Sequence, residues 1–359
     1  MGPRTERGPR PEREQRTAPG PRTEREQRTE REQRDVLRAA SMYYLQDLTQ
    51  DVIARHLGTS RSTVSRLIKR ARETGLVEIT LRPASTRAPG LGRSLQATFG
   101  VDAYVVPVPD TAGEVERLEQ VATTGARLVG QWFDSDMVLG VAWGTTLAAV
   151  ARHLVTKPTR SSAVVQLNGA ANTRTTGIEY ASGLISTFGA AFGAAEHYFP
   201  VPAFFDFPET KAAMWRERSI RRVLEMQRRA DVAVFSVGAG AGAVPSHVYS
   251  AGYLDATDLQ VLAGEGVVGD VCTVFLRADG SWQDIPLNAR ATGPTPAELA
   301  RIPRRVCVAA GDAKVPPLLA ALRAGVVTDL VVDEVTATSL LAAAGARAGR
   351  RPVTATVTG

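Results

Sequence analysis

The stretch that decides the amino-terminal fold runs from Thr49 to Leu81 and reads TQDVIARHLGTSRSTVSRLIKRARETGLVEITL. Thr49 is expected to cap a first helix, Gly58 to supply the permissive backbone of a sharp turn, and Ser60 to cap a second helix. Gly75 is expected to end that helix, and the alternating apolar residues of 76–81 suit a short strand. Two helices joined by a tight turn and followed by a strand predict a winged helix-turn-helix.

The second helix has one apolar and one polar face. Val64, Leu67, Ile68 and Ala71 recur at helical spacing and are expected to face inward. A helix fits the major groove of B-DNA, where arginine pairs bidentately with guanine and lysine neutralises phosphate. The residues that we expect at the DNA are Arg61, Ser62, Thr63, Ser65, Arg66 and Lys69, with Lys69 at a phosphate.

The local charge favours a DNA-binding unit. The alternative is an ordinary helical hairpin whose basic face is exposed to solvent and binds nothing. Between Arg55 and Arg87 there are eight basic residues and two acidic ones. Basic patches of this kind supply the salt-dependent affinity of nucleic-acid-binding proteins. Arg82 and Arg87 are expected to reach the DNA backbone beside the wing.

Composition limits the remaining possibilities. The chain has 359 residues, 44% of them apolar, and a formal net charge of +6, and it has no apolar run of the roughly 20 residues that a membrane helix requires. No secretory signal is visible, so a cytoplasmic location and no membrane partner are expected. Cys272 and Cys307 lie in apolar runs and are predicted to be buried thiols. The four histidines have no metal-ligand spacing, and we expect neither a metal nor a cofactor.

The chain is predicted to have five parts. Residues 1–34, which repeat Thr-Glu-Arg-Glu-Gln-Arg, contain almost nothing apolar and are expected to be disordered, with a frayed helix near their end. Two alternatives stay open for this segment: it adds non-specific affinity for DNA, or it is a spurious upstream extension of the reading frame. Residues 35–84 form the DNA-binding unit, 85–100 a linker helix, 101–344 a larger domain, and 345–359 an unstructured tail.

The larger domain is predicted to be an α/β domain. Near-continuous apolar runs, separated by helical stretches, indicate a mostly parallel sheet covered on both faces. The runs lie at 103–108, 137–143, 163–167, 231–237, 305–310 and 329–333. Ligands of such sheets bind at the carboxyl ends of the strands.

Two glycine-containing loops follow predicted strands. Gly144, Thr145 and Thr146 join a strand to a helix, and a helix amino terminus with two hydroxyls suits a phosphate; in the alternative, Thr145 only caps the helix. The run Gly238-Ala-Gly240-Ala-Gly242-Ala243 formally matches the dinucleotide-binding pattern G-x-G-x-x-G/A. Pro245 interrupts the helix that the pattern requires, which favours a glycine-rich loop lining a small-ligand pocket over NAD binding.

The order of these features resembles the SorC family of sugar-responsive bacterial transcriptional regulators from about Val36 to Ala344. The matching segments are the helix-turn-helix, VLGVAWGTTL, VQLNGA (165–170), GEGVVGDVCTVFLRADG (264–280), VAAGDAK (308–314) and LVVDEVTATSLL (330–341). The resemblance implies a winged helix-turn-helix joined to an effector domain similar to sugar-phosphate isomerases and glucosamine-phosphate deaminases. It also implies a phosphorylated sugar as effector.

The family's ligand positions carry over to particular residues here. The resemblance places the phosphate at Gly144, Thr145 and Thr146. The other matching positions are Asn168, Gly169, Ala170, Asp270 and Lys314. This chain has Asp270 where the family often has glutamate, and it lacks the basic residue that some relatives place at 168–170. These departures leave the identity of the sugar open and argue against a covalent sugar-lysine adduct at that loop.

Three functions follow from these patterns. The leading one is a regulator of carbohydrate metabolism that binds a palindromic operator as a homodimer or homotetramer and responds to a phosphorylated sugar. The alternative is a sugar-phosphate isomerase or deaminase fused to a DNA-binding module. It has Asp270, Asp312 and Glu265 as acidic candidates but no evident constellation. The third, an NADH-responsive redox sensor, depends on the Gly238 cluster.

Overall fold

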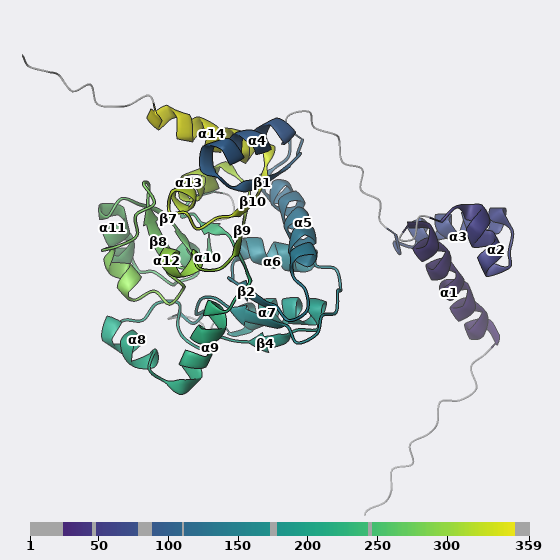
Figure 1. Cartoon of the computed structure of the whole chain (residues 1–359), viewed down its shortest axis with the longest axis horizontal. Coiled ribbons are helices and arrows are strands. Elements are labelled where there is room, and N and C mark those ends of the chain that lie inside the picture. Colours follow the sequence, from purple (N-terminus) through teal and green to yellow (C-terminus); the bar gives the residue numbers. More distant parts are fainter. Residues whose placement is uncertain are drawn as a thin grey trace, which may run out of the picture. The chain divides into compact units, whose positions relative to one another are not determined.

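The structure, a computed structural model, describes residues 24–44, 48–77, 88–109, 111–172, 178–242 and 246–348. The chain divides into two compact units, with the boundary between Arg82 and Pro83 (Figure 1).

The smaller unit is a bundle of three helices, α1 (Glu24–Tyr44), α2 (Gln50–Leu57) and α3 (Arg61–Glu73). The predicted caps are confirmed. Thr49 accepts a hydrogen bond from the backbone of Val52, and Ser60 accepts one from the backbone of Thr63 at 3.2 Å. Gly58 ends α2 with φ 63°, the left-handed conformation that favours glycine. These caps fix the tight turn between α2 and α3.

The start of α1 corrects one expectation. Residues 24–34, where a frayed helix was expected only near the end of a disordered extension, form the first part of α1. Val36 and Ala39, farther along the helix, are buried against α2 and α3, and Glu32 pairs with Arg70 on α3. Once packing anchors a helix, each further residue adds a hydrogen bond without a new nucleation cost, so α1 extends toward the amino terminus. Residues 78–81 of the predicted wing strand, together with Arg82 and Arg87, lie outside the described residues.

The larger unit is built on a seven-stranded sheet in which every pairing is parallel. In spatial order its strands are β1 (Asp102–Val106), β10 (Asp329–Asp333), β9 (Arg304–Ala309), β5 (Val232–Phe235), β2 (Val138–Val141), β3 (Ala163–Gln166) and β4 (Ala195–His197). Six of these strands were predicted from the apolar runs. The short, exposed β4 was not, because AEH carries no apolar signal.

Helices cover both faces of this sheet (Figure 1). On one face, Val141, Val308 and Val331 pack against α5 (Glu114–Trp132), α6 (Thr145–Arg152) and α7 (Ile178–Phe192). On the other, Cys307 and Leu330 pack against α4 (Ala88–Phe99), α9 (Arg218–Arg228), α13 (Val315–Arg323) and α14 (Glu334–Ala348). Adjacent residues of one strand therefore lie in opposite cores, which explains the continuous apolar runs.

A second, antiparallel sheet lies beside the first. Its strands are β6 (Val237–Gly238), β7 (Val267–Val271) and β8 (Val274–Arg277). The remaining elements are α8 (Pro208–Met214), α10 (His247–Ser250), α11 (Ala256–Gly264) and α12 (Pro296–Leu299), with short 3-10 helices η1 (Pro286–Ala289) and η2 (Asp312–Lys314). This small sheet was not predicted, although the apolar run around Cys272 forms its β7–β8 hairpin.

Both ends of the larger unit differ from the predicted boundaries. The helix expected to be a linker is α4, whose Leu95 is fully buried in the core of the larger unit. It therefore packs as part of that unit. The last helix, α14, continues to Ala348, beyond the predicted end at Ala344.

The order of the strands reverses in the middle of the sheet. From β2 the chain moves outward through β3 and β4, and it then returns to place β5 on the other side of β2. The connections that leave β2 and β5 diverge, so a crevice opens at their carboxyl ends. The fold thus predicts a ligand site beyond Val141 and Phe235.

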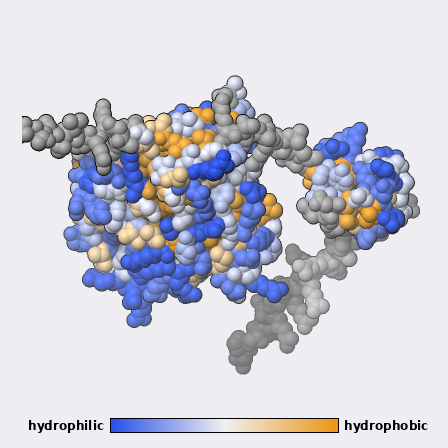
Figure 2. All heavy atoms as spheres, turned by 45° about the horizontal axis from the view of Figure 1, so that its top comes forward, coloured by the Kyte–Doolittle hydropathy of each residue, from blue (hydrophilic) through white to orange (hydrophobic). Residues whose placement is uncertain are grey.

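Hydrophilic residues cover most of the visible surface of both units, and hydrophobic residues gather in smaller patches (Figure 2). Among the described residues, no helix has both the length and the apolar character needed to cross a membrane.

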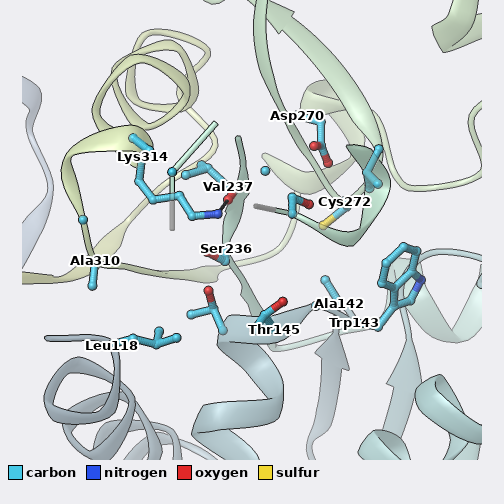
Figure 3. A pocket seen from close by; sticks show the side chains of 18 of the residues that line it. Leu118, Ala142, Trp143, Thr145, Ser236, Val237, Asp270, Cys272, Ala310 and Lys314 are labelled. Atoms are coloured by element: carbon cyan, nitrogen blue, oxygen red, sulfur yellow. Dashed lines mark hydrogen bonds between the residues drawn. The ribbon is translucent and has the colours of Figure 1, made fainter. Parts of the chain in front are cut away.

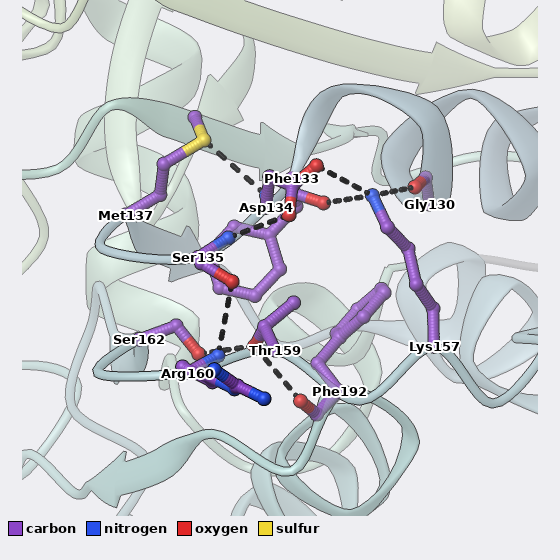
Figure 4. A network of polar contacts seen from close by, with 10 residues as sticks. All are labelled: Gly130, Phe133, Asp134, Ser135, Met137, Lys157, Thr159, Arg160, Ser162 and Phe192. Carbon is purple, nitrogen blue, oxygen red and sulfur yellow. Dashed lines mark hydrogen bonds and ion pairs between the residues drawn. The ribbon is translucent and has the colours of Figure 1, made fainter.

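A lysine fixes the entry to β2 (Figure 4). The Lys157 ammonium donates to the carbonyl oxygens of Gly130 and Phe133 at 3.1 and 2.8 Å, and it lies 3.3 Å from the Asp134 carboxylate. These carbonyls end α5, where a cation is favoured by the helix dipole. The same loop is held by the Arg160 backbone N–H, which donates to Ser135.

Replacing Lys157 by methionine removes these bonds while keeping a long apolar stem. We expect Lys157→Met to lower the free energy of unfolding by about 1–2 kcal/mol, measured by urea denaturation. Arg160→Met is the matched control: the Arg160 side chain is exposed, and only its backbone joins the network. A loss no larger than that of the control, about 0.5 kcal/mol or less, contradicts the capping role.

Candidate functional site

A cavity lies where the strand order reverses, at the carboxyl ends of β2, β3, β5 and β9 (Figure 3). The residues that line it come from these strand ends, from α5 and from the β7–β8 hairpin. They include Glu114, Leu118, Trp143, Gly144, Thr145, Thr146, Asn168, Ser236, Val237, Gly238, Asp270, Cys272, Thr273, Gly311 and Lys314. The structure therefore brings six of the eight predicted effector residues to one place.

The junction between β2 and α6 forms one wall. Gly144 has φ 153° and ψ 165°, a conformation open essentially to glycine, and α6 starts at the next residue. As in any α-helix, the first backbone N–H groups of α6 have no intrahelical acceptor, and no side chain among the described residues caps them. Thr146 is buried, and the Thr145 hydroxyl is buried without a hydrogen-bond partner in the described part of the chain. The alternative in which Thr145 caps α6 is therefore wrong.

Asp270 lies on β7 and is 4% exposed. One carboxylate oxygen accepts a hydrogen bond from the Thr273 backbone at 3.0 Å, and the other has no partner among the described residues. A Cβ at Gly238 would lie 1.8 Å from that second oxygen, so only glycine leaves room for the carboxylate. Burial raises the pKa of Asp270 to about 6, opposed by the Thr273 N–H, by the Lys314 charge and by the nearby Tyr249 hydroxyl, which lies outside hydrogen-bond geometry.

Lys314 lies at the end of η2, immediately before α13. Its ammonium donates to the Val237 carbonyl at 2.7 Å. Burial lowers the pKa of Lys314, and the Asp270 carboxylate opposes that shift. Figure 3 shows Lys314 and Asp270 entering from different elements. Among the described lining residues, Lys314 is the one cation, and Asp270 and Glu114 are the two acids, a mixture that suits a ligand with both anionic and hydroxyl groups.

Four buried polar atoms around the cavity have no hydrogen-bond partner among the described residues. They are the hydroxyls of Thr145 and Ser236, the amide oxygen of Asn168 and one oxygen of Asp270. Native proteins leave few such atoms, because an unpaired buried polar group costs about 1–3 kcal/mol. Their convergence on one cavity indicates that a polar ligand completes them.

Gly169 and Ala170 are placed differently from the other predicted residues. Neither lines the cavity, and their backbone groups are already bonded inside the protein. The Gly169 N–H donates to Thr292, its carbonyl accepts from the Trp143 indole, and the Ala170 N–H donates to the Val201 carbonyl. A Cβ at Gly169 would lie 2.2 Å from the Pro202 oxygen. This turn therefore positions Asn168.

The β7–β8 hairpin contributes residues that the sequence did not reveal as site residues. Its two-residue turn, Cys272 and Thr273, has φ 49° and 69°, strained for residues other than glycine. Such strain persists only where the surroundings impose it, and it is common at ligand sites. Cys272 and Cys307 are free and buried, as predicted. Positive φ at non-glycine residues has no signal in the sequence.

The glycine cluster after β5 lines the same cavity. Gly238 and Gly242 are among its lining residues, which confirms the prediction of a glycine-rich loop at a small-ligand pocket. Gly238 pairs with Asp270 in the antiparallel sheet instead of opening a strand-turn-helix for a dinucleotide. Ala243 to Pro245 lie outside the described residues.

The acidic candidates for catalysis are not gathered. Asp270 lines the cavity, whereas Asp312 is exposed beside Ser339 and Glu265 is paired with Arg277. The structure therefore does not bring the three proposed acids together.

The outer face of α3 forms a separate candidate site for nucleic acid. Val64, Ile68 and Ala71 are buried and Leu67 is half-buried, as the spacing predicted. The side chains of Arg61, Ser62, Ser65, Arg66 and Lys69 are exposed. Thr63 is half-buried, and its hydroxyl is bonded to Ser60 and to Arg66, so it takes part in the helix cap.

Comparisons with known proteins match both units of the chain. A family model described as a putative sugar-binding domain matches residues 85–342, and one described as the MarR family matches residues 37–88. The deoxyribonucleoside regulator of Bacillus subtilis strain 168 is 32% identical over 308 residues, which cover 85% of this chain and 96% of that protein.

Two solved structures share the fold. A domain of a possible sugar-binding transcriptional regulator from Arthrobacter aurescens TC1 is 49% identical with a TM-score of 0.67, over 73% of this chain and all of that one. The full-length sorbitol operon regulator SorC from Klebsiella pneumoniae is 26% identical with a TM-score of 0.73, over 86% of this chain and 98% of that one.

The Asp270 carboxyl makes stability depend on pH. Its pKa of about 6 lies above the 3.8 of an unperturbed aspartate, so its protonation stabilises the fold fully below pH 3.8, and this effect is lost as the pH rises through 6. Asp270→Asn has no charge to bury. Relative to wild type, we expect its free energy of unfolding to increase by up to about 3 kcal/mol between about pH 4 and pH 7 in urea titrations.

The exposed Asp206, changed to asparagine, serves as the control. Its difference from wild type is expected to vary with pH by less than about 0.5 kcal/mol. A pH-independent difference between Asp270→Asn and wild type contradicts the burial of an ionisable carboxyl at this position.

Proposed function

The chain belongs to the SorC family of sugar-binding transcriptional regulators, and from that premise we propose that a phosphorylated sugar in this cavity controls its affinity for an operator. Helix-turn-helix DNA binding and sugar binding are properties of the family. The phosphate on the sugar, the residues that hold it and the coupling to DNA are the proposal.

One observation carries the proposal. Four buried polar atoms that have no partner among the described residues surround a cavity that also contains the uncapped amino terminus of α6 and the Lys314 ammonium. An anion is favoured at a helix amino terminus because the N–H groups and the helix dipole both point toward it. Sugar hydroxyls both donate and accept, so they satisfy carboxylate, amide and hydroxyl partners. A phosphorylated sugar supplies both kinds of group.

We assign the phosphate to the backbone and hydroxyls of Gly144, Thr145 and Thr146, with Lys314 supplying a positive charge. Asp270 and Asn168 then accept hydrogen bonds from the sugar hydroxyls. Gly169 and Ala170, also predicted as ligand residues, act by positioning Asn168.

At the DNA, we propose that Arg61, Ser62, Ser65 and Arg66 contact base edges and that Lys69 contacts a phosphate. One helix-turn-helix reads a half-site, so a homodimer or homotetramer on a palindromic operator follows from this assignment. The coupling between sugar and DNA sites is expected to be about 1–3 kcal/mol. The curated relatives are named regulators of transcription, and no observation favours the isomerase or deaminase alternative.

Isothermal calorimetry with a panel of pentose and hexose phosphates, each beside its unphosphorylated sugar, tests the ligand class. We expect binding only with the phosphate present. Thr145→Val keeps the shape of the side chain and removes the hydroxyl; because a bond to a charged group contributes about 1.5–3 kcal/mol, affinity should fall by about 10-fold or more.

The control is Thr187→Val, an exposed position on α7 whose hydroxyl bonds only within its helix. It should bind like wild type. Equal binding of free and phosphorylated sugars, or unchanged affinity in Thr145→Val, removes the basis for the phosphate assignment.

DNA recognition is tested on duplexes selected from a random library by the wild-type chain. Arg66→Gln should weaken binding by about 1–3 kcal/mol and relax preference at one base pair, whereas Lys69→Gln should reduce the salt slope by about 1 without altering preference. Arg38→Gln on α1, also exposed, is the control. If Arg66→Gln and Arg38→Gln select the same sequences as wild type, α3 is not the recognition helix.

A further inference from the structure

A dense group of arginines lies on α9 and its two ends. Six arginines occur within 14 residues, and all six side chains are exposed: Arg216, Arg218, Arg221, Arg222, Arg228 and Arg229. Only Glu217 and Glu225 offset them in this segment. We call this group the α9 arginine face.

The helix that displays this face is firmly attached to the sheet. Ile220 is buried, and Gln227 is buried with its amide donating to the carbonyls of Gln166 and Leu167 at 2.8 and 3.1 Å. These bonds hold α9 against the carboxyl end of β3. Figure 1 shows α8 and α9 together at one end of the larger unit, so the arginines are carried on a fixed surface.

These arginines differ from three others in the same unit that are paired with acids. Arg152 pairs with Glu119, Arg277 with Glu265 and Arg290 with Asp258. On α9, Arg221 lies 3.9 Å from Glu225, and the other five arginines form no ion pair with described residues. Folding therefore leaves their charge available.

The excess charge is local. From Pro83 to Gly359 the chain has 25 Lys and Arg residues and 25 Asp and Glu residues, so this part is neutral as a whole. Because the domain has no net charge, its charges do not destabilise the fold by mutual repulsion. The local excess of positive charge still attracts anions at close range. All six cations are arginine, whose planar fork binds phosphate bidentately, and none is lysine.

The size of the face fits duplex DNA. From Arg218 to Arg229 the helical rise covers roughly 16 Å, and a duplex of that length carries roughly nine phosphate charges. The helix-turn-helix of the same chain holds the larger unit near DNA, which raises the effective phosphate concentration at α9. Weak contacts at this face are therefore populated when the chain is on DNA.

We propose that the α9 arginine face binds the phosphate backbone of duplex DNA outside the bases that α3 reads. This inference rests on the proposed binding of DNA by α3. It assigns to the sugar-binding unit a second, sequence-independent contact that increases affinity and footprint. A second copy of the chain or an acidic protein are the competing occupants.

The test measures binding of the full chain to a random-sequence duplex of about 60 base pairs by fluorescence anisotropy at several KCl concentrations. Each phosphate contact contributes about 0.9 to the slope of log affinity against log salt. The variant Arg218→Gln, Arg222→Gln, Arg229→Gln is expected to reduce this slope by about 2 to 3.

The matched control neutralises three exposed arginines elsewhere in the unit, Arg127, Arg160 and Arg301, and changes net charge equally. It should keep the wild-type slope. A third variant, Arg218→Lys, Arg222→Lys, Arg229→Lys, should keep most of the wild-type slope, because it keeps the charge. Thermal melting and light scattering check that fold and oligomeric state are unchanged.

The outcomes separate the two proposals. If the wild-type chain binds no DNA, the proposed function fails. If wild type binds DNA and the α9 variant keeps its slope, only the α9 inference fails. A change of oligomeric state in the α9 variant identifies the α9 arginine face as a contact between copies of the chain. This result also contradicts the proposed DNA contact.

A measurement on the wild-type chain is independent of any variant. Phenylglyoxal modifies accessible arginines, and peptide mass spectrometry locates them. The 60-base-pair duplex should slow modification at residues 216–229 several-fold and leave Arg127 and Arg160 unchanged. Equal rates with and without DNA contradict the contact.

Discussion

The reversal of strand order between β2 and β5 is the constraint on which the proposed sugar site depends. It separates the connections that leave two neighbouring strands and opens a crevice at their carboxyl ends. Gly144 then lets the chain turn at once into α6 with a backbone conformation denied to other residues. Without that turn, the helix amino terminus would not face the same space as Asp270 and Lys314.

The charge of the chain is divided along its length. Residues 1–82 have 18 basic and 12 acidic residues, which accounts for the whole net charge of +6, whereas the rest is balanced. The DNA-binding unit is therefore positive overall. The sugar-binding unit has only local fields, positive at α9 and mixed in the cavity. Binding an anionic ligand in a neutral domain needs such local features, and the structure supplies them at the α6 amino terminus and at Lys314.

Much of the fold was predictable because its main signals are local. Strands buried on both faces give continuous apolar runs, and Thr49, Gly58 and Ser60 are cap and turn residues whose role depends on their own neighbours. Contacts between distant residues were not predictable. The hydroxyl of Ser236 is unpartnered, and the Gly169 backbone is bonded to Thr292, only because of how the sheet folds.

For the candidate site, too, local signals were predictable from the sequence and contacts between distant residues were not. Gly144, Thr145 and Thr146 follow from a strand that runs into a helix, whereas Asp270 and Lys314 were reached through the family resemblance. Their proximity depends on the antiparallel sheet, which the sequence did not reveal. The strained turn at Cys272 was also hidden, since positive φ outside glycine is imposed by tertiary packing.

The central claim is that sugar phosphate and DNA bind one chain with coupled free energies. Linkage requires the factor by which the sugar phosphate changes DNA affinity to equal the factor by which DNA changes sugar-phosphate affinity. Anisotropy with the selected duplex, with and without saturating ligand, and calorimetry with and without duplex measure the two factors. We expect equal factors of about 5 to 150. A DNA affinity that no sugar phosphate changes contradicts the account.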